Sequence, residues 1–345
     1  AGAIVSVADY AETFDSNNLT IVPNGSDKIG SQNENAILST KGQSITLIYV
    51  DGTQGWINTM DSTSNVRGLP PFVEATGGTI TTAPCGNYKI HTFTGPGTFA
   101  VTNAGTAPNN VVDYLVVAGG GGSGDNYGAG SGAGGYRESV PSPAVWTASP
   151  IANPGGALPV SVQSYPITVG SGGAAGSNGD GGIGGISVFS TITSTGGGGG
   201  GGSCGAQPGN PGGSGGGGGG SSASSAGAGN TPPVSPSQGF PGGSTGGAGA
   251  AAGGGATEAG GAYPGPSKGG DGAGTAINPA SPVGTPGPSG PLRYFAGGGA
   301  GQGAAGGTGG GASPGNGGTI NTGGGAGNEG QTGGSGIVII RYKFQ

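Results

Sequence analysis

Short runs of apolar residues, many of them alternating with polar ones, recur along the chain and are separated by turn residues. In the first 74 residues such runs lie at 4–7, 19–22 and 45–50, and Pro-Asn-Gly-Ser and Asp-Gly follow the last two. Alternation with a period of two, bounded by Gly, Pro, Asn or Asp, predicts β-strands and tight turns. Residues 1–74, which end in the stiff proline-containing stretch 69–74, are therefore predicted to form a short N-terminal β module.

A second set of strand-like runs begins after residue 75. Its members lie at 88–94, 98–101, 111–117, 165–169, 186–193 and 337–344. The first two flank Gly95-Pro96-Gly97, which predicts a hairpin. No segment carries apolar residues at helical spacing, so residues 75–345 are predicted to form an all-β, jelly-roll-like β-sandwich.

The run at 337–344 is rich in β-branched and aromatic residues and needs a partner strand. The best candidate is the run at 111–117, more than 200 positions upstream. If these two strands pair, the glycine-rich stretch between them emerges from one β-domain. Residues 196–334 are therefore predicted to be an insertion that the strand 337–344 closes.

Glycine accounts for 93 of the 345 residues and proline for 26, which is typical of low-complexity or disordered chains. Collagen is excluded because uninterrupted glycine runs, such as 196–202 and 215–220, break its three-residue repeat. Few large apolar side chains lie in 196–334, so they cannot offset an ordering cost of about 1–2 kcal/mol per residue. Polyproline II segments point their N–H and C=O groups outward, and glycine lets such segments bond to one another. The insertion is thus predicted to be ordered, as bundled polyglycine helices of the polyproline II type.

Charge and the length of the apolar runs exclude two classes of partner. Charged residues make up 7% of the chain, the net charge is −6 and the nine Lys and Arg residues are scattered, so no nucleic-acid surface is predicted. No stretch reaches 18 consecutive apolar residues, so no membrane insertion is predicted. Cys85 and Cys204 are the only cysteines, and the sequence leaves open whether they form a disulfide or remain free thiols.

No constellation of residues predicts an enzyme, a metal site or a bound cofactor. Residues 119–124 superficially match a dinucleotide-binding glycine pattern, but the residues after them cannot form the helix that such a site needs. Asp180 and Asp271 stand singly, whereas calcium-binding repeats need regularly spaced aspartates, so both are interpreted as turn residues. His91 lies in an alternating strand and has no nucleophile or paired carboxylate nearby in the sequence.

Candidate recognition residues are the aromatic side chains inside the insertion, each flanked by Pro, Gly or another aromatic residue, together with one neighbouring arginine. They are Phe240, Tyr263, Arg293, Tyr294 and Phe295. Aromatic side chains on rigid loops bind sugars or protein edges at a low entropic cost, and a guanidinium suits phosphate or carboxylate. The alternative, which the sequence leaves open, is that these aromatics anchor the glycine bundle.

Two resemblances extend this picture. Five blocks occur in the order seen in the glycine-rich domain of phage tail-fibre and related surface proteins, at 91–99, 114–122, 134–138, 165–170 and 333–342. Four further blocks resemble a module common in tail-fibre proteins of marine and cyanobacterial phages, at 9–14, 17–21, 24–26 and 47–56. The resemblance implies a β-rich, multimeric virion appendage in which a sandwich is combined with polyglycine helices.

The function predicted from these observations is that of a non-enzymatic virion appendage, a tail fibre or surface fibre, whose rigid glycine-rich tip recognises the host. Its predicted partners are further copies of itself, other virion structural proteins, and a host cell-surface glycan or outer-membrane protein. Because residues 1–74 carry many apolar residues for so small a module, association of three copies is predicted. The alternative is a self-assembling extracellular filament or coat subunit at the cell surface, whose glycine lattice is purely structural.

Overall fold

The computed structural model describes residues 2–62, 72–177, 179–280 and 282–345, and every regular element in these ranges is a β-strand. The all-β prediction is therefore confirmed. The chain divides into two compact units, residues 1–70 and residues 71–345. The described residues form no helix, and so they contain no helix that is long and apolar enough to span a membrane.

The first unit contains one three-stranded antiparallel sheet and one separate strand pair. The sheet has the order β1 (Ile4–Ala8), β4 (Ser44–Asp51), β5 (Gly55–Ser62), and the pair is β2 (Leu19–Ile21) with β3 (Ala36–Leu38). Leu38, Ile45 and Leu47 are buried at the centre of its small core. The Asp9 carboxylate accepts hydrogen bonds from three backbone N–H groups, those of Thr13, Phe14 and Gly42. The strands predicted at 4–7, 19–22 and 45–50 are thus confirmed.

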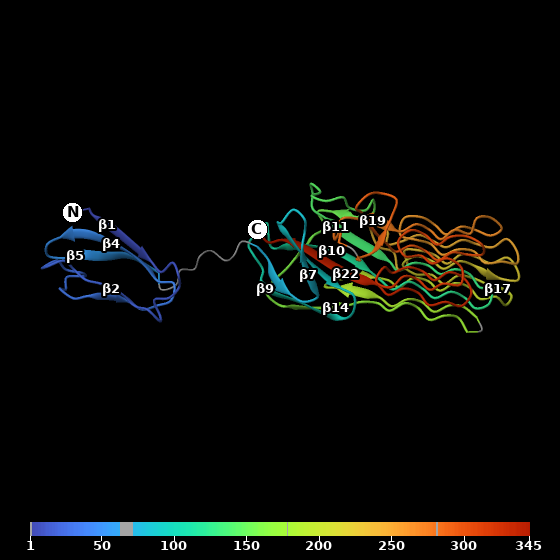
Figure 1. Ribbon diagram of the computed structural model, residues 1–345, viewed down its shortest axis with the longest axis horizontal. Coiled ribbons are helices and arrows are strands. Elements are labelled where there is room, and N and C mark those ends of the chain that lie inside the picture. The colour runs from blue at the N-terminus through green and yellow to red at the C-terminus, as the bar shows by residue number, and fades with distance from the viewer. Residues whose placement is uncertain (1, 63–71, 178, 281) are drawn as a thin grey trace. The chain divides into compact units, whose positions relative to one another are not determined.

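The second unit is built on a β-sandwich of two sheets (Figure 1). The first sheet has the order β12-β11-β10-β22-β8-β7, with β13 also paired to β10. Its strands are β7 (Thr79–Thr82), β8 (Tyr88–Phe93), β10 (Val111–Val117), β11 (Tyr136–Val140), β12 (Asn153–Pro154), β13 (Leu158–Pro159) and β22 (Ile337–Lys343). The second sheet, in the order β16-β15-β14-β9-β6, is made of β6 (Glu74–Thr76), β9 (Gly97–Asn103), β14 (Ser164–Thr168), β15 (Ser187–Phe189) and β16 (Ile192–Ser194).

The core of the sandwich lies between these two sheets. Aromatic rings from both sheets meet there, with the Phe99 ring 5.9 Å from Phe189 and 6.1 Å from Tyr342 in edge-to-face contacts. Aliphatic residues of β10 and β22, such as Val116 and Ile340, complete the same cluster. The opposite face of the first sheet is also buried, so each of its two central strands carries an unbroken apolar stretch, residues 114–117 in β10 and 337–340 in β22.

The predicted long-range strand pair is confirmed. Strand β22 is antiparallel to β10, with Val117 opposite Ile337 and Asp113 opposite Arg341. On its other side β22 pairs with β8, where Val338 is opposite Phe93. The strand that follows the insertion therefore lies in the middle of the first sheet.

Two local predictions in this region were wrong. Strands β8 and β9, which were expected to form a hairpin, belong to different sheets, and residues 94–96 carry the chain from one sheet to the other. The reason is that β22 occupies the position beside β8 that β9 would have taken. The single strand expected at 186–193 is a pair, β15 and β16, joined by a tight turn in which Ser190 has a positive φ of 53°.

Beyond the sandwich, extended segments run side by side and are joined by backbone hydrogen bonds (Figure 1). We call this region the glycine lattice; its segments come from 118–135, 170–185 and 196–334, so it begins further upstream than predicted. Its bonds repeat every third residue. The N–H groups of residues 119, 122 and 125 donate to the carbonyls of 185, 182 and 179, whereas those of 120 and 123 donate to 334 and 331.

The bundled polyglycine helices predicted for 196–334 are not seen. The segments carry no assigned helix and are extended chain, interrupted by the short strands β17 (Ala206–Gln207), β18 (Gly219–Gly220), β19 (Ala273–Thr275), β20 (Thr285–Pro286) and β21 (Arg293–Phe295). The N–H groups do bond between segments, as expected for the insertion, but the segments themselves have no helical assignment. The backbone still provides the order that the side chains cannot.

Glycine is required in the lattice because the backbones approach so closely. A Cβ atom on Gly121 would lie 2.3 Å from the carbonyl oxygen of Gly198, and one on Gly253 would lie 1.8 Å from that of Ser131. Both contacts are with backbone, which cannot rotate away as a side chain can. A side chain at either position would push two segments apart.

A buried carboxylate fastens the lattice to the sandwich. Glu138 on β11 accepts hydrogen bonds from the Tyr136 hydroxyl at 2.6 Å and from the Ser149 N–H at 3.1 Å, and from the Thr275 hydroxyl on β19 at 2.5 Å. Burial raises the pKa of Glu138 above its ordinary value. Around this contact, Ile277 and Phe295 of the insertion pack on the outer face of the first sheet.

Candidate functional site

Three of the five predicted recognition residues lie together on β21, where they contact the rest of their own domain. Phe295 is fully buried in the apolar cluster beneath the first sheet, which leaves it no surface for a receptor. The Tyr294 ring lies so close to Gly274 and Gly287 that a Cβ on either would overlap it. The Arg293 guanidinium donates to the carbonyls of Val283 and Gly284, the latter at 2.7 Å. The contacts of Tyr294 and Phe295 fit their interpretation as anchors of the glycine bundle, and Arg293 is bonded within the same domain.

Phe240 and Tyr263 lie elsewhere in the lattice. Phe240 is 37% exposed, and its backbone bonds to Gly255 and Gly215. Tyr263 is half-buried, and its N–H donates to the carbonyl of Ser244 at 3.0 Å. The five predicted residues are therefore not brought together into one site.

Tyr263 borders a surface hollow of about 300 Å³, which we call the distal hollow. It is lined by Tyr127, Ser203, Gly220, Ser221, Ala248, Gly249, Tyr263 and Gln302. Gly220 belongs to β18, which pairs with β17, and β17 lies at the end of the lattice farthest from the sandwich (Figure 1). The hollow therefore belongs to the tip of the lattice.

The residues of the distal hollow define its chemistry. Tyr127, which sequence reasoning missed, is 70% exposed in the turn where the lattice segment 118–135 reverses. The Tyr263 ring rests against Gly249, where a Cβ would lie 2.3 Å from the ring. The lining includes two phenol rings, two serine hydroxyls and one amide, but no charged side chain. Such a surface suits a neutral hydroxylated ligand, which stacks on the rings and exchanges hydrogen bonds with the polar groups.

The remaining candidates from the sequence have structural contacts. His91 is fully buried; its Nδ1 lies 2.7 Å from the Gly77 carbonyl and its Nε2 lies 3.0 Å from the Tyr342 hydroxyl. Burial lowers the pKa of His91, which favours the neutral ring. The backbone N–H groups of residues 119–124 all donate to backbone carbonyls of the lattice, so they are not free to hold a phosphate.

The single aspartates also fasten segments to one another. Asp180 accepts a hydrogen bond from the Gly202 N–H at 2.8 Å, and Asp271 accepts one from the Thr308 N–H at 2.9 Å. Within the described ranges, no three His, Cys, Asp or Glu side chains are grouped as metal ligands would be. Cys85 and Cys204 are both exposed and free.

Comparison with known families assigns the second unit. The sequence model of the glycine-rich domain matches residues 92–343, which is more than half of the chain. The chain therefore belongs to the glycine-rich domain family. The match runs from β8 to β22 and so takes in most of the sandwich together with the whole glycine lattice. No curated protein matches the chain.

Proposed function

We propose that this protein is a non-enzymatic appendage of a virion, a tail fibre or surface fibre, which holds the tip of its glycine lattice against the surface of a host cell. The observation that carries the proposal is the distal hollow, with Tyr127 and Tyr263 at the end of the lattice farthest from the sandwich. The proposed ligand is a neutral glycan of the host surface. The resemblance of residues 9–56 to a tail-fibre module supports the location on a virion.

The backbone bonds of the lattice support this role. A binding surface is most effective when its side chains are already held in place, because less entropy is lost on binding. Here the loops that carry the two tyrosines are bonded to other segments of the lattice: Ala129 donates to Gly201 at 2.8 Å, and Gly246 donates to Tyr263 at 2.7 Å. The tip loops can vary in sequence without disturbing the sandwich core.

The first unit is proposed to join copies of the protein to one another and to other virion structural proteins. Several of its large apolar side chains are exposed, among them Ile4, Val22, Ile37 and Met60. Exposed apolar groups of this number on a small unit are typical of an interface. In addition, β1 and β5 are the two edges of their sheet and carry unpaired backbone groups. These edges are also what a self-assembling filament subunit would use, which keeps that alternative open to test.

The test is a double substitution in the distal hollow. Tyr127→Ala with Tyr263→Ala is expected to lower binding to an array of neutral bacterial oligosaccharides at least tenfold, because both stacking surfaces are lost. The melting temperature should change little. The matched control is Ile320→Ala, which removes another exposed side chain of the same domain.

Equal binding by the double variant and the parent would overturn the proposed contact surface. Electron microscopy of the purified protein tests the alternative. Long filaments formed by the protein alone would favour the filament subunit, whereas discrete particles of a few copies would favour the appendage.

A further inference from the structure

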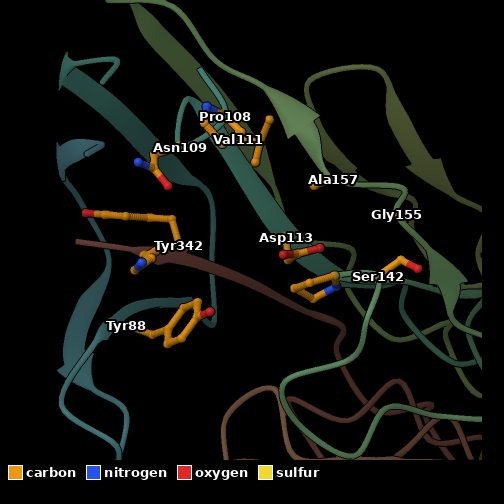
Figure 2. Close-up of a pocket in the computed structure, with 11 residues that line it drawn as sticks. Tyr88, Pro108, Asn109, Val111, Asp113, Ser142, Gly155, Ala157 and Tyr342 are labelled. Carbon is orange, nitrogen blue, oxygen red and sulfur yellow. The ribbon is translucent and has the colours of Figure 1, made fainter. Parts of the chain in front are cut away.

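A second cavity lies on the first sheet of the sandwich, away from the tip of the lattice. Its volume is about 380 Å³, which is at the small end of the range for small-molecule sites. Residues from β8, β10 and β22 face two loops and the β12–β13 region across it (Figure 2). It is lined by Tyr88, Pro108, Asn109, Val111, Asp113, Pro141, Ser142, Gly155, Ala157, Tyr342 and Lys343.

Asp113 is the buried acid of this cavity. In Figure 2 its carboxylate lies between Asn109 and Tyr88 on one side and Ser142 on the other. The side chain is only 6% exposed. Its Oδ1 accepts a hydrogen bond from the Ser139 hydroxyl at 2.8 Å, and Ser139 is in turn held by the Tyr114 N–H at 3.1 Å. The second carboxylate oxygen, Oδ2, has no hydrogen-bond donor among the described residues.

The natural partner of this carboxylate is turned away from it. Arg341 is directly opposite Asp113 in the β10–β22 register, yet within the described part of the chain the two form no ion pair. The Arg341 guanidinium donates to the carbonyls of Ala276 and Ile277, both at 3.1 Å. It is also held over Trp146, 4.1 Å from the ring centroid. The buried carboxylate of Asp113 and the buried guanidinium of Arg341 thus belong to directly opposite residues, but each is hydrogen-bonded to other groups and not to its counterpart.

The other charged groups near Asp113 do not take the place of Arg341 as its ion-pair partner. Glu138 on β11 is acidic and interacts unfavourably with an ionised Asp113. The Lys343 ammonium lies over the Phe72 ring, 5.3 Å from its centroid. The Arg341 guanidinium carbon lies over the ring of Tyr88 on β8, 4.8 Å from the ring centroid. Within the described residues, the cavity therefore presents one buried carboxylate with an open oxygen and no cationic side chain paired with it.

We propose that this cavity binds the protonated amine of a small hydroxylated molecule, with an amino sugar as the ligand class. The ammonium would donate to the open Oδ2 of Asp113. The amide of Asn109 and the hydroxyl of Ser142 line the same cavity and make no hydrogen bond to another described residue, so both are available to the ligand's hydroxyl groups. This site is separate from the distal hollow and does not rest on the proposed host recognition.

The raised pKa of Asp113 supports the proposed amine-binding site. Burial raises the pKa of Asp113 to about 6. An ionised carboxylate in such a place is costly, and a cation bound to it stabilises the charged form. Affinity for an amine should therefore fall as the pH drops through about 6 and Asp113 takes up a proton. Arg341 and Glu138 keep their charge interactions with Asp113 in both the free and the bound protein.

Titration calorimetry with glucosamine, N-acetylglucosamine and glucose tests the proposal. At pH 7 we expect glucosamine to bind with a millimolar or lower Kd, and the two uncharged sugars to bind at least tenfold more weakly. Asp113→Asn, which keeps the shape and loses the charge, should weaken glucosamine binding at least tenfold. Between pH 7 and pH 5 the parent should lose about tenfold in affinity, in line with a pKa of about 6, whereas the Asn variant should show no such change.

Asp180→Asn is the matched control, because Asp180 is also bonded to a neighbour but lies in the lattice. It should bind glucosamine as the parent does, and the melting temperatures of both variants would show that they are folded. Three results would overturn the proposal: no heat of binding for glucosamine at 20 mM (~20 mM being well above a weak-site Kd), equal binding of glucose and glucosamine, or unchanged affinity in Asp113→Asn.

Discussion

Glycine residues in the lattice differ in how much they are needed, although the sequence makes them look alike. Gly121 lies against the backbone of another segment, whereas Gly247 has open space where its Cβ would be. What separates them is the approach of a segment that is distant in the sequence. Composition therefore predicts a close-packed backbone without showing which glycines it depends on.

Substitution of these two glycines makes the difference measurable. We expect Gly121→Ala to lower the free energy of unfolding by about 3 kcal/mol, because the added methyl overlaps backbone that cannot move aside. Gly247→Ala should change it by no more than about 0.5 kcal/mol. Denaturant unfolding of both variants measures the values. Equal effects would mean that the lattice has room for side chains.

The aromatic candidates show a similar limit at the residue scale. Phe295 and Tyr263 have similar surroundings in the sequence, since each is an aromatic residue next to small or rigid residues. One is fully buried and the other borders a hollow, because different segments cover them. The sequence could not have predicted Asp113 as a binding residue. Its carboxylate lacks an ion-pair partner only because the Arg341 side chain bonds to the Ala276 and Ile277 carbonyls instead. Asp271 shows the same limit: it was interpreted as a turn residue, but its carboxylate accepts a hydrogen bond from the Thr308 N–H, 37 positions further along the chain.

Among the elements, β22 was the most predictable and the β8–β9 connection the least. The run 337–344 is rich in β-branched and aromatic residues and needs a partner strand, and the run 111–117 was the best upstream candidate. The Gly-Pro-Gly turn after β8 is a local signal, and it was overridden by the distant strand β22. Strand identity can thus be predicted from composition, whereas pairing depends on competition between partners.

Removal of residues 337–345 tests how much the sandwich depends on β22. We expect the second unit to lose its cooperative melting transition, because β10 and β8 lose their shared neighbour in the middle of the sheet. Removal of Gln345 alone is the control, since its side chain makes a single exposed hydrogen bond to Gly86. Circular dichroism and calorimetry would detect the change. A shortened protein that melts as the parent does would show that the sheet holds without β22.

At the scale of the whole molecule, the apolar surface of the first unit predicts association. Val5 and Val22 are exposed and border one apolar hollow of about 230 Å³ with Ile21, Leu47 and Trp56. Burial of such side chains contributes about 25 cal/mol per Å², so an interface that covered this hollow would stabilise an oligomer. Composition was enough to suggest this, whereas the position of the hollow required the fold.

Light scattering of variants tests the association. We expect the parent to have the mass of three copies at micromolar concentration. Val5→Asp with Val22→Asp should shift it toward single copies, because two charges would have to be buried in the interface. Ile320→Asp, a change at an exposed position of the second unit, should leave the mass unchanged. A parent protein that is monomeric under these conditions would contradict the prediction.

The central position of β22 has a consequence for how the chain is made. Strand β10 ends at Val117 and β22 begins at Ile337, so the whole lattice has to be translated before the two can pair. At roughly 5–20 residues per second, that takes on the order of tens of seconds. During this time the nascent chain exposes an apolar strand with an open edge, which is prone to aggregate. The cell that produces this protein therefore has to shield a half-built sheet on the ribosome.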